Sequence, residues 1–332
     1  MTLGPSDRLL RALGRALLPR PWLAPRLAGA PLRNDRGDTL DPSIQAMLKL
    51  QGVAGPALGD PSPEAARQDM RRGCALASAP ARPVTTRDGT VTGPRGPLAV
   101  RRYEPAGLDL PHLVYFHGGG WAVGDLDTVD PFCRRLALDA ELVVISVDYA
   151  LAPEHPFPAA VRDAHAAVEA IEAEVGGRVG VGGDSAGGHL AALVAQEREV
   201  AWQLLIYPAT DLRRLTASHQ TLSRGFMLEK EAIDRYLDWL GADPEDPEAS
   251  PALRPAPATP AVVATAGFDP LRDEGEDYVR ALQQAGAEVV DLRFPSLVHG
   301  FVHLDGLAPR ADEAVRQITD AARHVARTRD TV

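Results

Sequence analysis

The chain has 332 residues, 45% of them hydrophobic and 24% charged, which is enough apolar content for one sizeable buried core. Its net charge of −10 argues against a nucleic-acid partner, because nucleic-acid-binding proteins need a dense basic patch. The sequence has no run of about 20 apolar residues that could cross a bilayer. These values agree with one compact domain.

Cys74 and Cys133 have no metal-binding or redox spacing, so we expect buried, reduced thiols and a cytoplasmic location. There is no H-E-x-x-H motif or carboxylate cluster, and we predict neither a metal nor another cofactor. The sequence leaves open whether the chain is a monomer or a homodimer.

Leucines recur at helical spacing near the start of the chain, with arginines between them. This pattern predicts a short amphipathic helix over residues 6–18, capped by Ser6. The arginines interrupt every apolar stretch, which argues against a signal peptide. Residues 1–39 are read as an N-terminal extension, either helical or flexible. An interfacial membrane helix stays an alternative, but we expect no membrane partner, because one short basic helix binds lipid weakly.

Residues 40–82 contain two predicted helices, at 42–50 and 63–75, separated by a Gly-Pro stretch. We interpret this region as the N-terminal part of a helical cap. Residues 84–91, with Asp88-Gly89 as a turn signal, are expected to pair as a hairpin with a strand that begins at Leu98.

A strand at residues 112–116 runs directly into His117-Gly118-Gly119-Gly120-Trp121. Successive glycines let backbone N–H groups converge on one point without side-chain obstruction, as an oxyanion hole requires. Gly118, Gly119 and Gly120 are therefore candidate oxyanion donors, with a flexible glycine turn as the alternative.

The most informative motif is Gly183-Asp184-Ser185-Ala186-Gly187-Gly188, which follows a predicted strand at 178–181 and precedes an alanine- and leucine-rich helix. The pattern G-x-S-x-G between a strand and a helix is typical of a nucleophile elbow. It predicts Ser185 as the nucleophile and the Ala186 amide as a further oxyanion donor.

A serine nucleophile needs a base and an orienting acid, each at the end of a later strand. Asp269 follows a predicted strand at 261–266, and His299 follows one at 289–294. We therefore predict Asp269 as the acid and His299 as the base, with His303 as the serious competitor. Asp273, Glu274 and Asp184 are the rival candidates for the acid. We expect Asp273 and Glu274 to lie on the solvated face of a helix at 272–284, and Asp184 to anchor the turn. His219 is expected to face solvent.

The predicted strands alternate with helices, which implies a mainly parallel sheet of the α/β class. The remaining predicted strands lie at 98–104, 142–147 and 202–206. We assign the core to residues 83–210 and 252–332, and a cap insert to residues 211–251, which contain a predicted helix at 229–240.

Together these motifs resemble the bacterial hormone-sensitive-lipase-like carboxylesterases, within the α/β-hydrolase fold. The resemblance spans about residues 40–327 and also rests on the segments Asp148-Tyr149, 151–160, 269–275 and 299–301. It implies a central sheet flanked by helices under a helical cap, and hydrolysis of short- to medium-chain carboxylic esters, with a small-molecule ester as the partner. An amidase or deacetylase with the same triad, or a non-catalytic ligand-binding member of the fold, are the alternatives.

Overall fold

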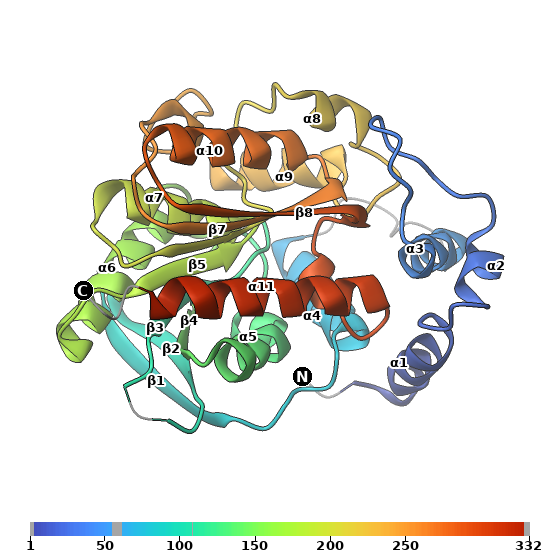
Figure 1. Cartoon of the computed structure of the whole chain (residues 1–332), viewed down its shortest axis with the longest axis horizontal. Coiled ribbons are helices and arrows are strands. Elements are labelled where there is room, and N and C mark those ends of the chain that lie inside the picture. Colours follow the sequence, from blue (N-terminus) through green and yellow to red (C-terminus); the bar gives the residue numbers. More distant parts are fainter. Residues whose placement is uncertain (1–2, 55–61, 108, 329–332) are drawn as a thin grey trace.

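The computed structural model describes residues 3–54, 62–107 and 109–328, and an eight-stranded sheet runs through its centre (Figure 1). The strands are β1 (Thr85–Gly93), β2 (Gly96–Glu104), β3 (His112–Phe116), β4 (Val143–Val147), β5 (Gly180–Asp184), β6 (Gln203–Ile206), β7 (Ala261–Phe268) and β8 (Val289–Val298). Their order across the sheet is β1-β2-β4-β3-β5-β6-β7-β8. β2 pairs antiparallel with β1 and β4, and every other pairing is parallel. The predicted α/β class with an antiparallel start is confirmed.

The central strands are covered on both faces, and every residue of β5, β6 and β7 is buried. Parallel strands of this kind consist of continuous apolar or small residues, which is why the sequence predicts them as strands. Because β3, β5, β6, β7 and β8 all run in the same direction, the loops at their carboxyl ends meet at one edge of the sheet. Ligand sites of open α/β sheets lie at this edge.

The first hairpin differs from its prediction. Asp88 and Gly89 lie inside β1, paired with Arg101 and Val100 of β2, and the chain turns between Gly93 and Gly96 instead. An Asp-Gly pair favours a turn only where the strands end. Here Asp88 accepts two hydrogen bonds from the Arg101 guanidinium across the strand pair, which favours continuation of the strand.

The helices form a layer on each face of the sheet and a cap beyond its edge. α5 (Leu126–Ala140) and α11 (Pro309–Arg327) cover one face, whereas α6 (Ala159–Val175), α7 (Ala186–Glu197) and α10 (Arg272–Gln284) cover the other (Figure 1). The remaining helices are α1 (Pro5–Leu17), α2 (Ala24–Ala28), α3 (Pro42–Ala54), α4 (Pro63–Ala77), α8 (Ala217–Thr221), α9 (Lys230–Leu240) and the 3₁₀ turns η1 (Pro251–Leu253) and η2 (Phe301–His303). The predicted cap helices are present within a few residues of their expected bounds.

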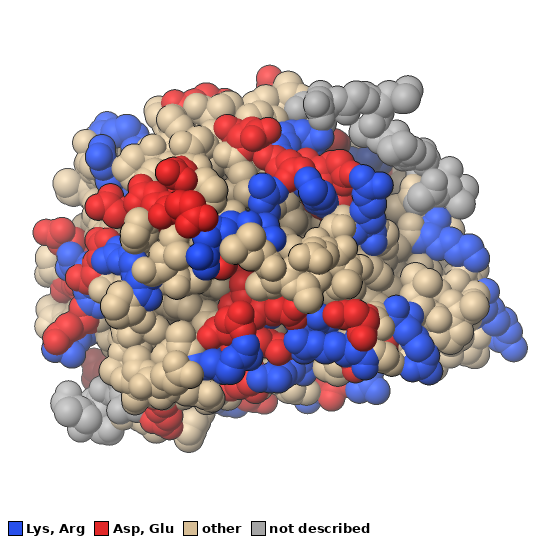
Figure 2. All heavy atoms as spheres, turned by 90° about the horizontal axis from the view of Figure 1, so that it is seen from above, with Lys and Arg blue, Asp and Glu red and all other residues tan. Residues whose placement is uncertain are grey.

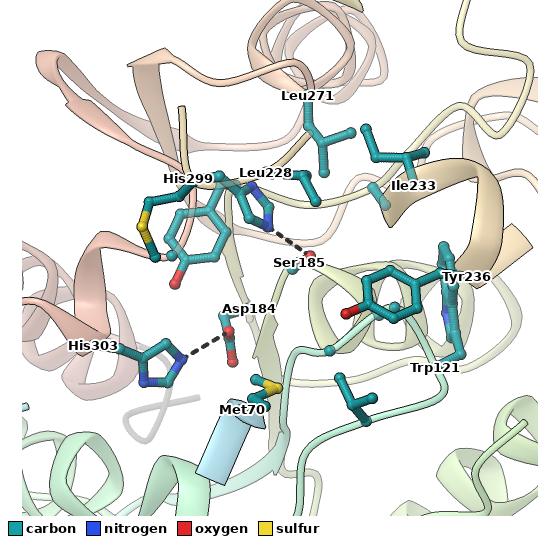
Figure 3. Close-up of a pocket in the computed structure, with 18 of the residues that line it drawn as sticks. Met70, Trp121, Asp184, Ser185, Leu228, Ile233, Tyr236, Leu271, His299 and His303 are labelled. Carbon is teal, nitrogen blue, oxygen red and sulfur yellow. Dashed lines mark hydrogen bonds and ion pairs between the residues drawn. The ribbon is translucent and has the colours of Figure 1, made fainter. Parts of the chain in front are cut away.

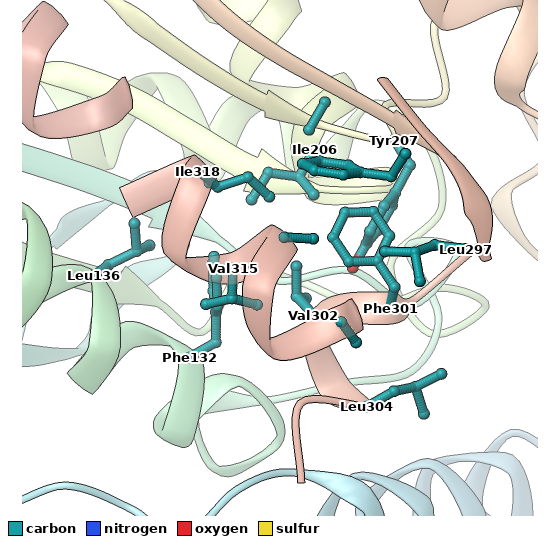
Figure 4. Close-up of a cluster of buried hydrophobic side chains, with 14 of the residues drawn as sticks. Phe132, Leu136, Ile206, Tyr207, Leu297, Phe301, Val302, Leu304, Val315 and Ile318 are labelled. Carbon is teal, nitrogen blue, oxygen red and sulfur yellow. The ribbon is translucent and has the colours of Figure 1, made fainter. Parts of the chain in front are cut away.

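One hydrophobic core reaches the edge of the sheet where the loops meet. Val315 and other side chains of α11 pack on Phe132 and on the end of β6 (Figure 4). Tyr207, directly after β6, contacts Phe301 with ring centroids 5.1 Å apart and His299 at 4.6 Å. The core thereby supports the loop that follows β8.

The N-terminal region is helical, although its cap differs from the prediction. α1 begins at Pro5 with Gly4 as the N-cap residue, so Ser6 lies inside the first turn and caps nothing. Proline is favoured at this first position, because its missing N–H has no acceptor there in any helix. No helix of the described residues is long and apolar enough to cross a membrane.

The last residues of the 1–39 segment hold the start of α10. Asp35 accepts two hydrogen bonds from the buried Arg272 guanidinium, at 2.7 and 2.8 Å, and Arg36 pairs with Asp273 and Glu276. Arg272 follows Asp269 by three residues, so these contacts lie close to the predicted catalytic acid.

We expect Asp35→Ala to lower the free energy of unfolding by about 2 kcal/mol, because a buried arginine loses a charged hydrogen-bond acceptor. Urea denaturation measures this change. Glu199→Ala is the matched control, since its ion pair with Arg178 is exposed on both sides and such pairs contribute about 0–1 kcal/mol. Equal effects of the two substitutions would contradict a role for Asp35 in holding α10.

Candidate active site

Ser185 occupies a strained turn between β5 and α7. Its backbone has φ 55° and ψ −119°, outside the regions that non-glycine residues ordinarily adopt. Two glycines make this turn possible. A β carbon at Gly183 would lie 2.3 Å from the Gly187 carbonyl carbon, and one at Gly187 would lie 1.9 Å from the Phe116 oxygen. The sequence pattern therefore has a steric cause, and it presents the Ser185 hydroxyl at the edge of the sheet.

The three residues predicted as a triad lie in one hydrogen-bonded chain. The Ser185 hydroxyl donates to His299 Nε2 at 2.9 Å (Figure 3), and His299 Nδ1 donates to Asp269 Oδ2 at 2.8 Å. Asp269 is fully buried, and its other oxygen accepts the Leu271 amide at 2.8 Å. Asp269 follows β7 and His299 follows β8, so adjacent parallel strands bring the acid and the base together.

The backbone amides of the glycine loop after β3 have two different roles. The Gly118 amide donates to Asp184 Oδ1 at 2.9 Å, so this predicted oxyanion donor is already occupied. Gly119 and Gly120 line the cavity beside Ser185 and have φ values of +126° and +55°. A β carbon at Gly120 would lie 2.4 Å from the Tyr236 ring, so only glycine fits there. Gly119 and Gly120 remain candidates together with Ala186, whose amide starts α7 and has no acceptor within that helix.

Trp121 connects this loop to the elbow helix and the cap. Its indole N–H donates to His189 Nδ1 at 3.1 Å, and His189 Nε2 donates to the Ala249 carbonyl oxygen at 2.8 Å. Burial lowers the pKa of His189 to about 4, so the ring is neutral and can accept from the indole. His189 is thus a structural histidine that holds three parts of the site together.

Asp184 and His303 form a second buried pair beneath the nucleophile (Figure 3). His303 Nε2 lies 3.5 Å from Asp184 Oδ2, and Asp184 Oδ1 accepts from the Tyr115 hydroxyl as well as from Gly118. His303 therefore contacts the residue before the nucleophile rather than the nucleophile itself. Asp184 anchors the turn as predicted, and it also holds the glycine loop.

Burial lowers the pKa of His303, but the Cys74 thiol and Asp184 outweigh it and hold that pKa well above its ordinary value. Burial raises the pKa of the Asp184 carboxyl, but His303, Tyr115 and the Gly118 amide hold it below its ordinary value. The pair is therefore ionised, and it completes the polar support of the elbow.

The raised pKa predicts a pH-dependent contribution of His303 to stability. That contribution is fully present below the unfolded-state pKa of about 6.5 and is lost as pH rises through the raised folded-state value. We expect His303→Gln to destabilise the protein, with a gap to the wild type that narrows as pH is raised from about 6.5. Urea unfolding at several pH values measures the gap. A gap that widens with pH would contradict the assigned ionisation, and the exposed His155→Gln should show no gap.

His219 and Glu274 correct two predictions. His219 was expected to face solvent and Glu274 to lie on a solvated helix face, yet both side chains are buried, and His219 Nε2 donates to Glu274 at 2.7 Å. The other Glu274 oxygen accepts the amides of Thr210 and Asp211. Burial raises the pKa of the Glu274 carboxyl, although these hydrogen bonds oppose the rise. No sequence pattern predicted the burial of this pair, because α10 has the pattern of an ordinary amphipathic helix, in which charged residues are expected to face solvent.

A cavity of about 440 Å³ opens above Ser185 and His299. Met70 of α4 lies on one side of the cavity, and Leu228, after β6, and Ile233 of α9 lie on the opposite side (Figure 3). Met47 of α3 also lines the cavity. In the described part of the chain, no group of three His, Cys, Asp or Glu side chains is placed to hold a metal ion.

The comparisons with known proteins agree with this geometry. A family model described as "alpha/beta hydrolase fold" matches residues 113–303. Carboxylic ester hydrolase LipN of Mycobacterium tuberculosis is 44% identical, over 88% of this chain and 85% of that protein. The ethyl acetate hydrolase of Pseudomonas putida is 35% identical, over 85% of this chain and 98% of that protein.

Solved structures give the same result. The ester hydrolase EH1AB1 from the metagenome of Lake Arreo, complexed with a derivative of bipyridine phosphonate, superposes with a TM-score of 0.82. The two proteins are 36% identical, and the match covers 86% of this chain and 98% of that one. The chain therefore belongs to the hormone-sensitive-lipase-like family of the α/β-hydrolase fold and is a carboxylic ester hydrolase.

Proposed function

We propose that the protein hydrolyses carboxylic esters through an acyl-enzyme on Ser185. His299 Nε2 takes the hydroxyl proton as Ser185 Oγ bonds to the ester carbonyl carbon. Asp269 holds the imidazole in the tautomer that accepts at Nε2 and stabilises the imidazolium that forms. The observation that carries this proposal is the continuous chain of 2.9 and 2.8 Å hydrogen bonds from Ser185 through His299 to Asp269.

In the tetrahedral intermediate the former carbonyl oxygen carries the negative charge. We assign its stabilisation to the amides of Gly119, Gly120 and Ala186, since Gly118 is bound to Asp184. The intermediate collapses when the carbonyl–alkoxy bond breaks and His299 gives its proton to the leaving alcohol. Water then attacks the acyl carbonyl, His299 takes a water proton and returns it to Ser185 Oγ, and the carboxylic acid leaves.

We further propose short- to medium-chain esters as substrates, with residues 40–82 and 211–251 acting together as the cap. The cavity lies within the usual range of small-ligand pockets, about 300–1,000 Å³. Its walls are mostly apolar, and they come from the two cap segments, where sequence variation can alter acyl selectivity without altering the catalytic groups. The name of the Pseudomonas putida relative specifies a short ester for that protein.

The test is a series of 4-nitrophenyl esters of increasing acyl length, with the matching anilides, assayed by kcat/KM. We expect the maximum at short or medium chains and a burst of nitrophenol when deacylation is slow. A maximum at the longest chains would overturn the acyl-length proposal. A higher kcat/KM on an anilide than on its ester would overturn the ester assignment in favour of an amidase.

A further inference from the structure

Helix α1 packs on the protein through its polar face. Asp7 forms an ion pair with Arg72 of α4 at 2.8 Å, and Arg15 donates to the carbonyl oxygen of Ser78. A surface helix ordinarily turns its apolar stripe to the core and its charged residues to water. In α1 the arrangement is reversed.

The outward face of α1 is apolar. Leu9, Leu10, Leu13 and Leu17 are between 42% and 61% exposed, and no residue of α1 is buried. Trp22, just beyond the helix, is 58% exposed. We call these five side chains the leucine face. Single exposed leucines are ordinary, but a contiguous group on one helix marks an interaction site.

Exposed arginines border the leucine face. None of Arg8, Arg20 and Arg26 has an acidic partner among the described residues, and the Arg26 guanidinium lies 5.9 Å from the centre of the Trp22 ring. The first 33 residues hold six arginines and one aspartate, although the whole chain has a net charge of −10. At the right-hand end of Figure 2, basic side chains lie beside uncharged surface. This region is therefore both basic and apolar.

We propose that the leucine face docks on the surface of an anionic lipid bilayer. The leucines enter the boundary between headgroups and acyl chains, Trp22 sits at the headgroup level, and the arginines pair with lipid phosphates. The helix lies on the bilayer and does not span it. A second copy of the chain fits this surface less well, because a twofold contact would bring the arginines of both copies together.

The docking surface is joined to the cap. α1 packs on α4, and α4 lines the cavity with Met70 (Figure 3). The consequence of docking for substrate access rests on the proposed function. A docked protein holds the cap against the lipid phase, in which apolar esters dissolve. We expected no membrane partner because one short basic helix binds lipid weakly. In the structure the helix is held against α4 by its polar side, so its leucines and Trp22 face outward together.

The test is flotation of the full chain with phosphatidylcholine vesicles, with and without phosphatidylglycerol, at low and high salt. We expect binding to the phosphatidylglycerol vesicles that weakens with salt. The double variant L9Q/L13Q, which leaves the charge unchanged, should lose at least about tenfold in affinity. L215Q is the matched control, since Leu215 is 66% exposed in the cap insert, and it should bind like the wild type.

Binding is measured without turnover, so its outcome is independent of the catalytic assignment. Wild-type hydrolysis of a soluble short ester by L9Q/L13Q shows that this variant is folded. Failure of the wild type to float with the anionic vesicles, or equal binding by L9Q/L13Q, overturns the proposal. So does a lipid-free dimer, detected by sedimentation, that L9Q/L13Q dissociates, because the leucine face would then join two copies.

Discussion

Ser185→Ala should lower kcat on a soluble short-chain ester by about 10⁴- to 10⁶-fold, because no other group can carry the acyl intermediate. KM should change little, since the cavity walls and the glycine loop are untouched. The residual rate would reflect substrate positioning and the oxyanion donors alone. Stopped assays at high enzyme concentration measure it.

Covalent labelling provides the second half of this test. An organophosphonate should modify the wild-type protein once, at Ser185, and should leave the alanine variant unmodified. Peptide mass spectrometry identifies the site. Labelling of a different serine, or near-normal turnover by the variant, would show that the elbow does not carry the nucleophile.

His299→Ala should be almost as severe as Ser185→Ala, with a loss of about 10⁴-fold or more in kcat, because His299 is the side chain that hydrogen-bonds to Ser185 Oγ. Asp269→Asn should cost about 10⁴-fold, since the amide favours the wrong imidazole tautomer.

His303→Ala is the discriminating comparison. His303 contacts Asp184 and lies one step removed from the reacting atoms, so we expect a loss below about 100-fold together with lower stability. Thermal unfolding separates the two effects. A larger loss of kcat for His303→Ala than for His299→Ala would mean that His303 is the base.

Local sequence carried much of the information about the site. The candidate residues Ser185, Asp269 and His299 each follow a segment that the sequence predicts as a strand, and the structure brings all three into hydrogen-bond contact. This worked because parallel strands place their carboxyl ends at one edge, so chain order after each strand already predicts proximity. The glycines of the elbow were readable for a similar reason, since neighbouring backbone excludes any side chain there.

Other features depended on neighbours that are distant in the sequence. Gly118 and Gly119 have the same local sequence pattern. Gly118 is excluded as an oxyanion donor only because its amide donates to Asp184, at the end of β5. Burial of His219 and Glu274 required the cap insert to fold against the start of α10. Local charge patterns cannot show such long-range contacts.

The strands, the elbow, the candidate triad and the amphipathic nature of α1 were predictable from the amino-acid sequence, because each follows from the period of apolar residues or from a local steric need. Which face of α1 packs on the protein depends instead on contacts between distant parts of the chain. Its period is the same whichever side is turned inward, and in the structure the polar side is turned inward, with Asp7 paired to Arg72 of α4. The four leucines of the opposite side are exposed.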